Sequence, residues 1–310
     1  MSGFSTDWLR LREPFDKAAR AIAMPALGLD QHVQSWQQKA SSGVVQMVDL
    51  GCGSGANFRA LAPHLGPAQH WRLYDHDPAL LAAVPAAISD WTIQTQQGHV
   101  DVESGQGGKR IHVQCPQFSA TIALHCVDLA RHLSSVSLTG VHLVTGSALL
   151  DLVSQDWLSA LVAQAQLNHT AMLFALSVDG RTTWSPVDQQ DERVHDLFTQ
   201  HQNRNKGFGP ALGMHAVPTV LRQLTQAGYL VRQSQSDWLM QGVQGIQGVG
   251  DQAMLLALID GIKDAAIEQS PSEQNMLMDW ALRRKHAIAA CELRVGHVDF
   301  LAKWPPSSQV

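Results

Sequence analysis

From residue 44 onward, short apolar runs alternate with segments in which apolar residues recur every three or four positions. The runs predict buried strands and the segments predict helices. Strands are predicted within 44–50, 70–75, 99–115, 119–130, 140–147, 170–178, 229–240 and 291–304. Helices are predicted over 57–65, 78–88, 217–228, after residue 147 through Trp157 and Leu161, and in two stretches within 250–286. Strands that alternate with helices indicate βαβ units, so we expect an α/β fold with a mostly parallel sheet.

The first 40 residues carry a helical pattern of their own. Apolar residues recur at helical spacing from Trp8 to Ile22. Pro14 lies inside this pattern, and we expect it to end one helix and begin another, because proline cannot donate the backbone hydrogen bond of a helix interior. We therefore expect an N-terminal helical cap over 1–40 and a main domain over 41–310, together forming one structural domain.

Composition and charge exclude several classes of partner. The chain has 310 residues, of which 45% are hydrophobic and 16% charged, and its net charge is −5. Nucleic-acid-binding proteins usually carry a basic field, and no cluster of lysine or arginine is present, so we expect neither a nucleic-acid nor a membrane-surface partner. No apolar run approaches the roughly 18 residues of a membrane span. The N-terminus lacks the pattern of a signal peptide, so we expect a cytoplasmic protein.

Cysteine and histidine give no metal or disulfide pattern. The four cysteines are scattered, and none forms a CxxC pair. This spacing indicates neither a disulfide framework nor a zinc ribbon. The 15 histidines include no HExxH motif. We expect no metal site.

A glycine-rich loop follows the first predicted strand of the alternating region. The stretch "VDLGCGSG" places Gly51, Gly53 and Gly55 within five positions. Glycine loses more conformational freedom on folding than any other residue, so three together need a reason. A glycine loop between a strand and a helix presents backbone N–H groups to a ligand that approaches closely. We expect a ligand at this loop.

Two ligand classes compete for the loop. The stretch "GCGSGA" satisfies the G-x-G-x-x-G/A fingerprint of dinucleotide-binding folds, and Asp75 follows Gly55 by 20 positions, as that fingerprint expects. Asp49 favours the other class, because a carboxylate two residues before the first glycine would repel a pyrophosphate. It suits a ligand with an amino group and no phosphate, and S-adenosylmethionine is such a ligand.

Four motifs resemble those of the class I S-adenosylmethionine-dependent methyltransferases. "VDLGCGSG" is similar to motif I of that family, hh[D/E]hGxGxG, and "LYDHDPALL" to its acidic second-strand motif. "HCVDLA" and "LVTGSALLD" resemble the ends of its third and fourth strands. The order of these motifs matches over 44 to about 240. The resemblance implies a Rossmann-like, seven-stranded, mostly parallel sheet with a reversed last strand and helices on both faces.

The resemblance also implies a role for each motif residue. Asp49 would lie near the amino group of the cofactor's methionine part, and Asp75 would accept hydrogen bonds from both ribose hydroxyls. His76 would pack beside the adenine, and Asp128 would bind the adenine amino group, although an aspartate here also suits a helix cap. The other cofactor-binding residues that it implies are Gly51, Cys52, Gly53, Gly55, Leu129, Gly146 and Ser147.

The class of methyl acceptor is limited mainly by a motif that is absent after the fourth predicted strand. Methyltransferases that act on exocyclic amines of bases carry [DN]PP[YF] there, whereas this chain has "TGSALL". We expect a small-molecule acceptor, methylated at oxygen or nitrogen. The segment 179–213 is expected to build the acceptor site. In it His195 and His201 are candidate general bases, because histidine titrates near neutral pH, and Arg204 and Lys206 are candidate binders of an anionic acceptor.

The sequence leaves two other functions open. One is an NAD-dependent oxidoreductase, from the dinucleotide fingerprint. The other is a protein that binds the cofactor without turnover. The sequence does not indicate an oligomeric state.

Overall fold

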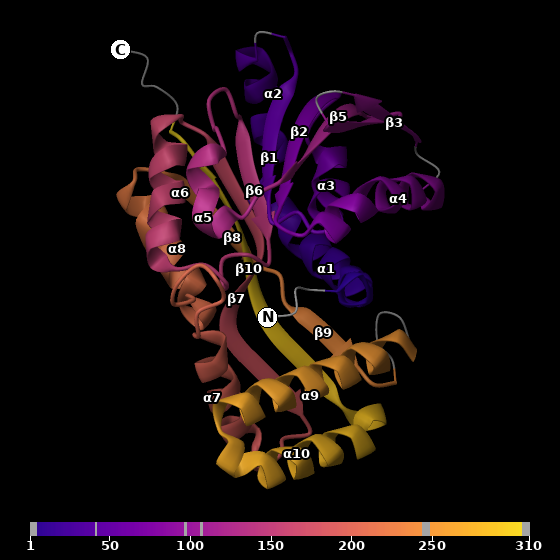
Figure 1. Cartoon of the computed structure of the whole chain (residues 1–310), viewed down its shortest axis with the longest axis vertical. Coiled ribbons are helices and arrows are strands. Elements are labelled where there is room, and N and C mark those ends of the chain that lie inside the picture. The colour runs from indigo at the N-terminus through magenta and orange to yellow at the C-terminus, as the bar shows by residue number, and fades with distance from the viewer. Residues whose placement is uncertain (1–4, 41, 96–97, 106–107, 244–248, 306–310) are drawn as a thin grey trace.

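One twisted sheet runs through the whole molecule (Figure 1). The computed structural model describes residues 5–40, 42–95, 98–105, 108–243 and 249–305. Within them, ten strands form a single sheet in the order β3-β4-β5-β2-β1-β6-β7-β10-β8, with β9 paired to β10. The strands are β1 (Val45–Leu50), β2 (Ala68–Asp75), β3 (His99–Gly105), β4 (Gly108–Gln114), β5 (Ser119–Cys126), β6 (Leu143–Ser147), β7 (Ala171–Ser185), β8 (Leu230–Gln235), β9 (Trp238–Gln241) and β10 (Glu292–Lys303).

Seven of these strands form the arrangement that the sequence predicts. β5, β2, β1, β6 and β7 are parallel neighbours. β10 is inserted between β7 and β8 and runs antiparallel to both. The α/β class, the mostly parallel sheet and the reversed last strand are therefore confirmed. β3 and β4 add an antiparallel hairpin at one edge.

Helices cover both faces of the sheet, and two apolar clusters fill the space beneath them. On β1, Met47 belongs to the cluster under α3 and α4, whereas Val48 belongs to the cluster under α6 and α8. Neighbouring residues of a strand point to opposite faces, so a strand buried on both sides is apolar at both. The helices are α1 (Thr6–Leu27), α2 (Asp30–Lys39), α3 (Ala56–Leu61), α4 (Pro78–Gln94), α5 (Leu129–His132), α6 (Gln155–Leu167), α7 (Asp191–Gln202), α8 (Ala216–Gln226), α9 (Val249–Gln269) and α10 (Gln274–His286).

The stretch from Trp8 to Ile22 lies in one long helix, α1, rather than in two. α1 begins after Ser5, whose Oγ accepts a hydrogen bond from the Trp8 N–H at 3.1 Å, and it ends at Gly28 in the left-handed conformation. It continues through Pro14, so the predicted break is wrong. Phe15 and other apolar residues of α1 are buried on one side, and this packing outweighs the loss of one hydrogen bond. The boundary proposed at residue 40 stays a prediction.

Two strands extend well past the rest of the sheet. β7 runs to Ser185 and pairs there with the start of β10, so the segment 179–213 begins as a strand. Figure 1 shows both strands reaching α9 and α10 at the lower end of the view. A third apolar cluster lies there, in which Trp184 of β7 meets Trp280 of α10 with ring centroids 6.0 Å apart. This half of β7 carries polar residues such as Asp179 and Arg181, so its sequence does not show the apolar pattern of a buried strand.

The aromatic packing beneath α3 gives a test of the core. Phe58 is fully buried and meets Trp71 of β2 edge to face, with ring centroids 5.2 Å apart. We expect Phe58→Ala to lower the free energy of unfolding by about 3–5 kcal/mol, because it removes apolar contacts and leaves a cavity. Ile93→Ala on α4 is the control, since Ile93 is 69% exposed, and it should change that free energy by less than about 1 kcal/mol. Urea denaturation measures both, and equal losses would contradict this account of the core.

Candidate functional site

The glycine loop between β1 and α3 is held by the end of β2. Gly51, Gly53 and Gly55 all have positive φ, at 66°, 53° and 83°, which residues with a side chain rarely adopt. Asp75 Oδ2 accepts a hydrogen bond from the Gly53 N–H at 2.8 Å, and Asp75 Oδ1 accepts one from the Asp77 N–H at 3.0 Å. The carboxylate of Asp75 therefore joins the glycine loop to the turn after β2.

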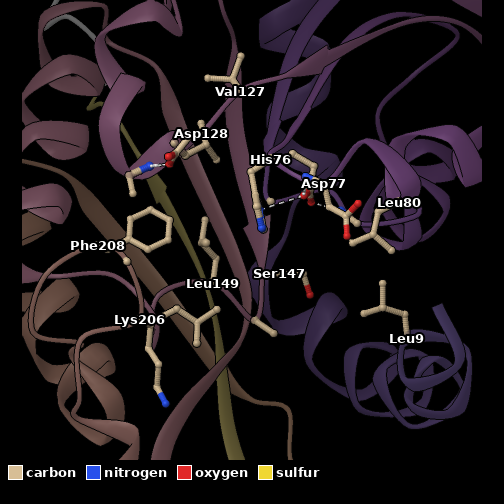
Figure 2. Close-up of a pocket in the computed structure, with 18 of the residues that line it drawn as sticks. Leu9, His76, Asp77, Leu80, Val127, Asp128, Ser147, Leu149, Lys206 and Phe208 are labelled. Atoms are coloured by element: carbon tan, nitrogen blue, oxygen red, sulfur yellow. Dashed lines mark hydrogen bonds and ion pairs between the residues drawn. The ribbon is translucent and has the colours of Figure 1, made fainter. Parts of the chain in front are cut away.

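A pocket opens at the carboxyl ends of β1, β2, β5 and β6 (Figure 2). This is the edge of a parallel sheet at which ligands bind. α1 supplies Leu9 and Arg12 to its wall, and the loop after α7 supplies a further side. The predicted site residues that line the pocket are Gly51, Gly53, Asp75, His76, Asp128, Leu129, Ser147 and Lys206.

Other predicted residues lie behind the wall of the pocket or away from it. Asp49 and Cys52 are buried beneath the glycine loop. A Cβ on Gly146 would lie 3.0 Å from Phe174 Cε1 and 3.1 Å from the Leu50 oxygen, so this glycine is explained by packing inside the sheet. Outside the residues that line the pocket are Asp49, Cys52, Gly55, Gly146, His195, His201 and Arg204.

Asp49 is a fully buried acid with an incomplete set of partners. Its Oδ1 accepts a hydrogen bond from Asn57 Nδ2 at 2.6 Å, while its Oδ2 has no partner among the described residues. Burial raises the pKa of Asp49 from 3.8 to about 7, against the lowering effects of the Asn57 hydrogen bond and the Arg20 charge. A cationic group placed near Asp49 would stabilise the ionised form of this buried carboxyl.

Arg20 of α1 is a buried cation whose charge acts on Asp49. Its Nε and Nη2 are shielded from solvent and have no hydrogen-bond partner among the described residues. Burial lowers the pKa of Arg20, and the charges of Asp299, Asp16 and Asp49 oppose this effect. Because buried charges are costly without partners, this group is suited to a ligand or water that supplies the missing bonds.

Asp128 and His76, for which the sequence resemblance implies contacts to adenine, both line the pocket. Asp128 Oδ1 accepts a hydrogen bond from the Ala130 N–H at 3.0 Å and so caps α5. Its side chain also lines the pocket, so the capping and binding interpretations are compatible. His76 is largely exposed, and its Nδ1 lies 3.4 Å from Asp75 Oδ1.

The two candidate bases lie on α7, away from the pocket. His201 Nε2 lies 3.0 Å from Glu268 Oε2 of α9, and His195 is partly buried on the same helix. Neither belongs to the residues that line the pocket. Their catalytic role stays a prediction that the geometry does not favour.

The sequence motifs give no role to the residues that form the apolar wall of the pocket. The lining residues to which the motifs give no role are Leu9, Arg12, Asp77, Leu80, Val127, Ala130, Arg131, Ala148, Leu149, Leu152, Gly207 and Phe208. Four of them, Asp77, Val127, Ala148 and Leu149, lie within two residues of a strand end, and that position is the signal by which they could have been found.

Two further observations concern metals and membranes. Within the described part of the chain, no three or more histidine, cysteine, aspartate or glutamate side chains are grouped to hold a metal ion. Among the helices of the described residues, none is long and apolar enough to span a membrane.

The chain resembles solved structures only at a distance. It matches no protein-family profile and no curated protein. A precorrin-6y C5,15-methyltransferase from Geobacter metallireducens has 9% identity and a TM-score of 0.39, over 89% of this chain and 87% of that one. A cyclopropane-fatty-acyl-phospholipid synthase-like protein from Lactobacillus casei has 12% identity and a TM-score of 0.41, over 88% and 92%.

A third solved structure is a geranyl diphosphate C-methyltransferase from Streptomyces coelicolor in complex with Mg²⁺, geranyl diphosphate and S-adenosylhomocysteine. It has 10% identity and a TM-score of 0.40, over 89% of this chain and 80% of that one. Similarity at this level does not transfer an activity. The function has to follow from the chain's own sheet and pocket.

The buried state of Asp49 predicts a pH dependence of stability. The folded protein holds this proton more tightly than the unfolded chain, so the contribution of Asp49 is full below pH 3.8 and is lost as pH rises through about 7. We expect Asp49→Asn to remove this loss. The stability of the variant relative to wild type should rise by about 1–3 kcal/mol between about pH 5 and pH 8. Urea denaturation of the ligand-free proteins measures it, and a constant difference would contradict the pKa of Asp49.

The placement of the two histidines predicts the outcome of their replacement. We expect His195→Gln and His201→Gln to retain methyl transfer within a few-fold of wild type, because neither side chain lines the pocket. Transfer of label from S-adenosylmethionine into small molecules of a cell extract measures this rate. A loss of about 10²- to 10⁴-fold would instead identify a general base.

Proposed function

We propose that the chain is an S-adenosylmethionine-dependent methyltransferase that acts on a small-molecule acceptor. The observation that carries this proposal is the hydrogen bond from the Gly53 N–H to Asp75 Oδ2. In a dinucleotide site a glycine loop offers its N–H groups to phosphates. In this chain the Gly53 N–H already donates to the carboxylate of Asp75. A second acid, Asp49, lies buried behind the same loop.

The sheet order also favours a methyltransferase over a dinucleotide-dependent oxidoreductase. The dinucleotide-binding sheet follows the order 3-2-1-4-5-6. In this chain β10 is inserted antiparallel between β7 and β8. This agrees with the reversed last strand that the sequence resemblance implies.

The residues of the pocket fit the proposed cofactor. Asp75 would accept hydrogen bonds from the ribose hydroxyls, and Asp128, with the Leu129 N–H, would bind the adenine. Gly51 and Gly53 would allow close approach of the ligand to the backbone. Asp49 Oδ2, which has no hydrogen-bond partner among the described residues, is matched in charge to the amino group of the methionine part. When bound, S-adenosylmethionine supplies an activated methyl group on its sulfonium.

The protein's own contribution would be to position the acceptor and exclude water. A donor that is already activated needs mainly correct orientation and a dry site. Leu9, Leu149 and Phe208 give the pocket apolar walls. The lining residues include one histidine, His76, which lies beside Asp75. This favours an acceptor nitrogen or oxygen that does not depend on a histidine base.

Replacing Asp75 tests the proposed cofactor site. Asp75→Asn keeps the shape of the side chain and removes its charge. We expect it to weaken S-adenosylhomocysteine binding by about 10- to 150-fold, because a hydrogen bond to a charged group contributes roughly 1.5–3 kcal/mol. Isothermal titration calorimetry measures the affinity.

The control is Asp101→Asn on the edge hairpin, where Asp101 is exposed, and its affinity should equal that of wild type. NAD titrated into the wild type should give no binding. Tight NAD binding, or an unchanged affinity of Asp75→Asn for S-adenosylhomocysteine, contradicts the proposal. Methyl transfer from labelled cofactor into an extract metabolite separates an enzyme from a protein that only binds the cofactor.

A further inference from the structure

The pocket has two chemically different sides. Asp75, Asp77 and Asp128 make one part of its lining acidic. Figure 2 shows Lys206 and Phe208 on the opposite side of the pocket from Asp77 and Leu80. The lining residues that come from the turn after β6 and from the loop that carries Lys206 include Ala148, Leu149, Leu152 and Phe208, which are apolar.

Lys206 differs from the two arginines of the lining because no carboxylate of the described residues lies within 4.0 Å of its ammonium group. Arg12 donates to both oxygens of Asp16, at 2.9 and 3.2 Å. Arg131 Nε lies 3.6 Å from Asp128 Oδ2. For Lys206, the described residues provide neither an ion pair within 4.0 Å nor a hydrogen bond to the ammonium group.

The acids in the neighbourhood of Lys206 are engaged or buried. Glu268 is paired with His201 and with Arg204. Asp151 Oδ1 is shielded from solvent, and burial raises the pKa of this carboxyl, which opposes its negative charge. Burial, followed by the charge of Arg204, lowers the pKa of Lys206. A half-buried ammonium in these surroundings gains free energy when an anion pairs with it.

The loop that carries Lys206 is preformed. Asn205 Oδ1 accepts hydrogen bonds from the Gly207 N–H at 2.8 Å and from the Gly209 N–H at 3.1 Å. The ring of Phe208 meets Trp157 edge to face, with centroids 5.5 Å apart. The residues on both sides of Lys206 are therefore fixed, and a charge on a fixed support binds with a smaller entropic cost.

We propose that the methyl acceptor is a small molecule with an anionic group, a carboxylate or a phosphate, that Lys206 binds. Its apolar part contacts the lining residues Leu149, Leu152 and Phe208. This inference rests on the proposed function and adds the chemical class of the acceptor. Arg204, which the sequence also suggested, is exposed and outside the lining, so it has no part in this contact.

Simple aromatic probes test the charge preference. Benzoate, phenyl phosphate and neutral benzamide are titrated by calorimetry into the protein with and without saturating S-adenosylhomocysteine. We expect at least one anion to bind at least about tenfold more tightly than benzamide, because the difference is a charge-assisted hydrogen bond. The anion that binds more tightly, benzoate or phenyl phosphate, distinguishes a carboxylate acceptor from a phosphate acceptor.

Variants assign the preference to one side chain. Lys206→Met should abolish it and Lys206→Arg should keep it, while all variants bind S-adenosylhomocysteine as wild type does. Arg204→Met is the matched control and should keep the preference. Equal binding of all probes, no measurable binding of either anion, or a preference that survives in Lys206→Met would overturn the inference. If S-adenosylhomocysteine itself fails to bind, the proposed function fails, and the titrations without it still test Lys206.

Discussion

The carboxylate of Asp75 is the junction on which the pocket depends. It accepts from Gly53 on the first loop and from Asp77 on the second, so both strand ends are fixed by one side chain. Three left-handed glycines within five positions would otherwise be free to take many conformations. The side chain that orders the loop also lies in the pocket wall. The same residue thus orders the site and is placed to bind a ligand.

Beneath this junction, charge is buried to an unusual extent. Arg12 stacks on Trp238, and Asp16 accepts a hydrogen bond from Trp238 Nε1 at 2.9 Å. α1 is thereby fixed to the extension of the sheet formed by β9. One turn further along, the buried Arg20 interacts electrostatically with Asp299 and Asp49. α1 therefore connects the pocket, the buried acids and the extended strands, which are far apart in the sequence.

The sheet and the part of the pocket at the ends of β1 and β2 could be predicted because their signals are local. A short apolar strand, a glycine loop and an acid at the next strand end lie within 31 positions, 45–75, and each has a direct structural meaning. The second half of β7 could not be predicted, because Arg181 on this strand pairs with Asp237 far along the chain. The continuity of α1 through Pro14 is decided by packing, which no local pattern contains.

The candidate bases illustrate the same limit. His201 is a reasonable base by residue type, but its partner Glu268 lies 67 positions away, on α9. Only the packing of α7 against α9 brings them together. Lys206, five residues after His201, lies in the pocket wall because Asn205 turns the chain there. In this segment the course of the backbone therefore indicates which residues line the pocket better than the residue type does.

Pro14, the first of two prolines within α1, has a kinetic consequence. It offers no N–H to the preceding turn, so the turns before it are joined to the rest of the helix by one hydrogen bond fewer. Leu9, which lies in the pocket wall, belongs to those turns, whereas Phe15 and Ala19 belong to the buried remainder. Arg12 donates to Asp16 across Pro14, so a side-chain contact spans the missing backbone bond. Opening of this helix end would then be timed by that contact and not by the movement of a loop.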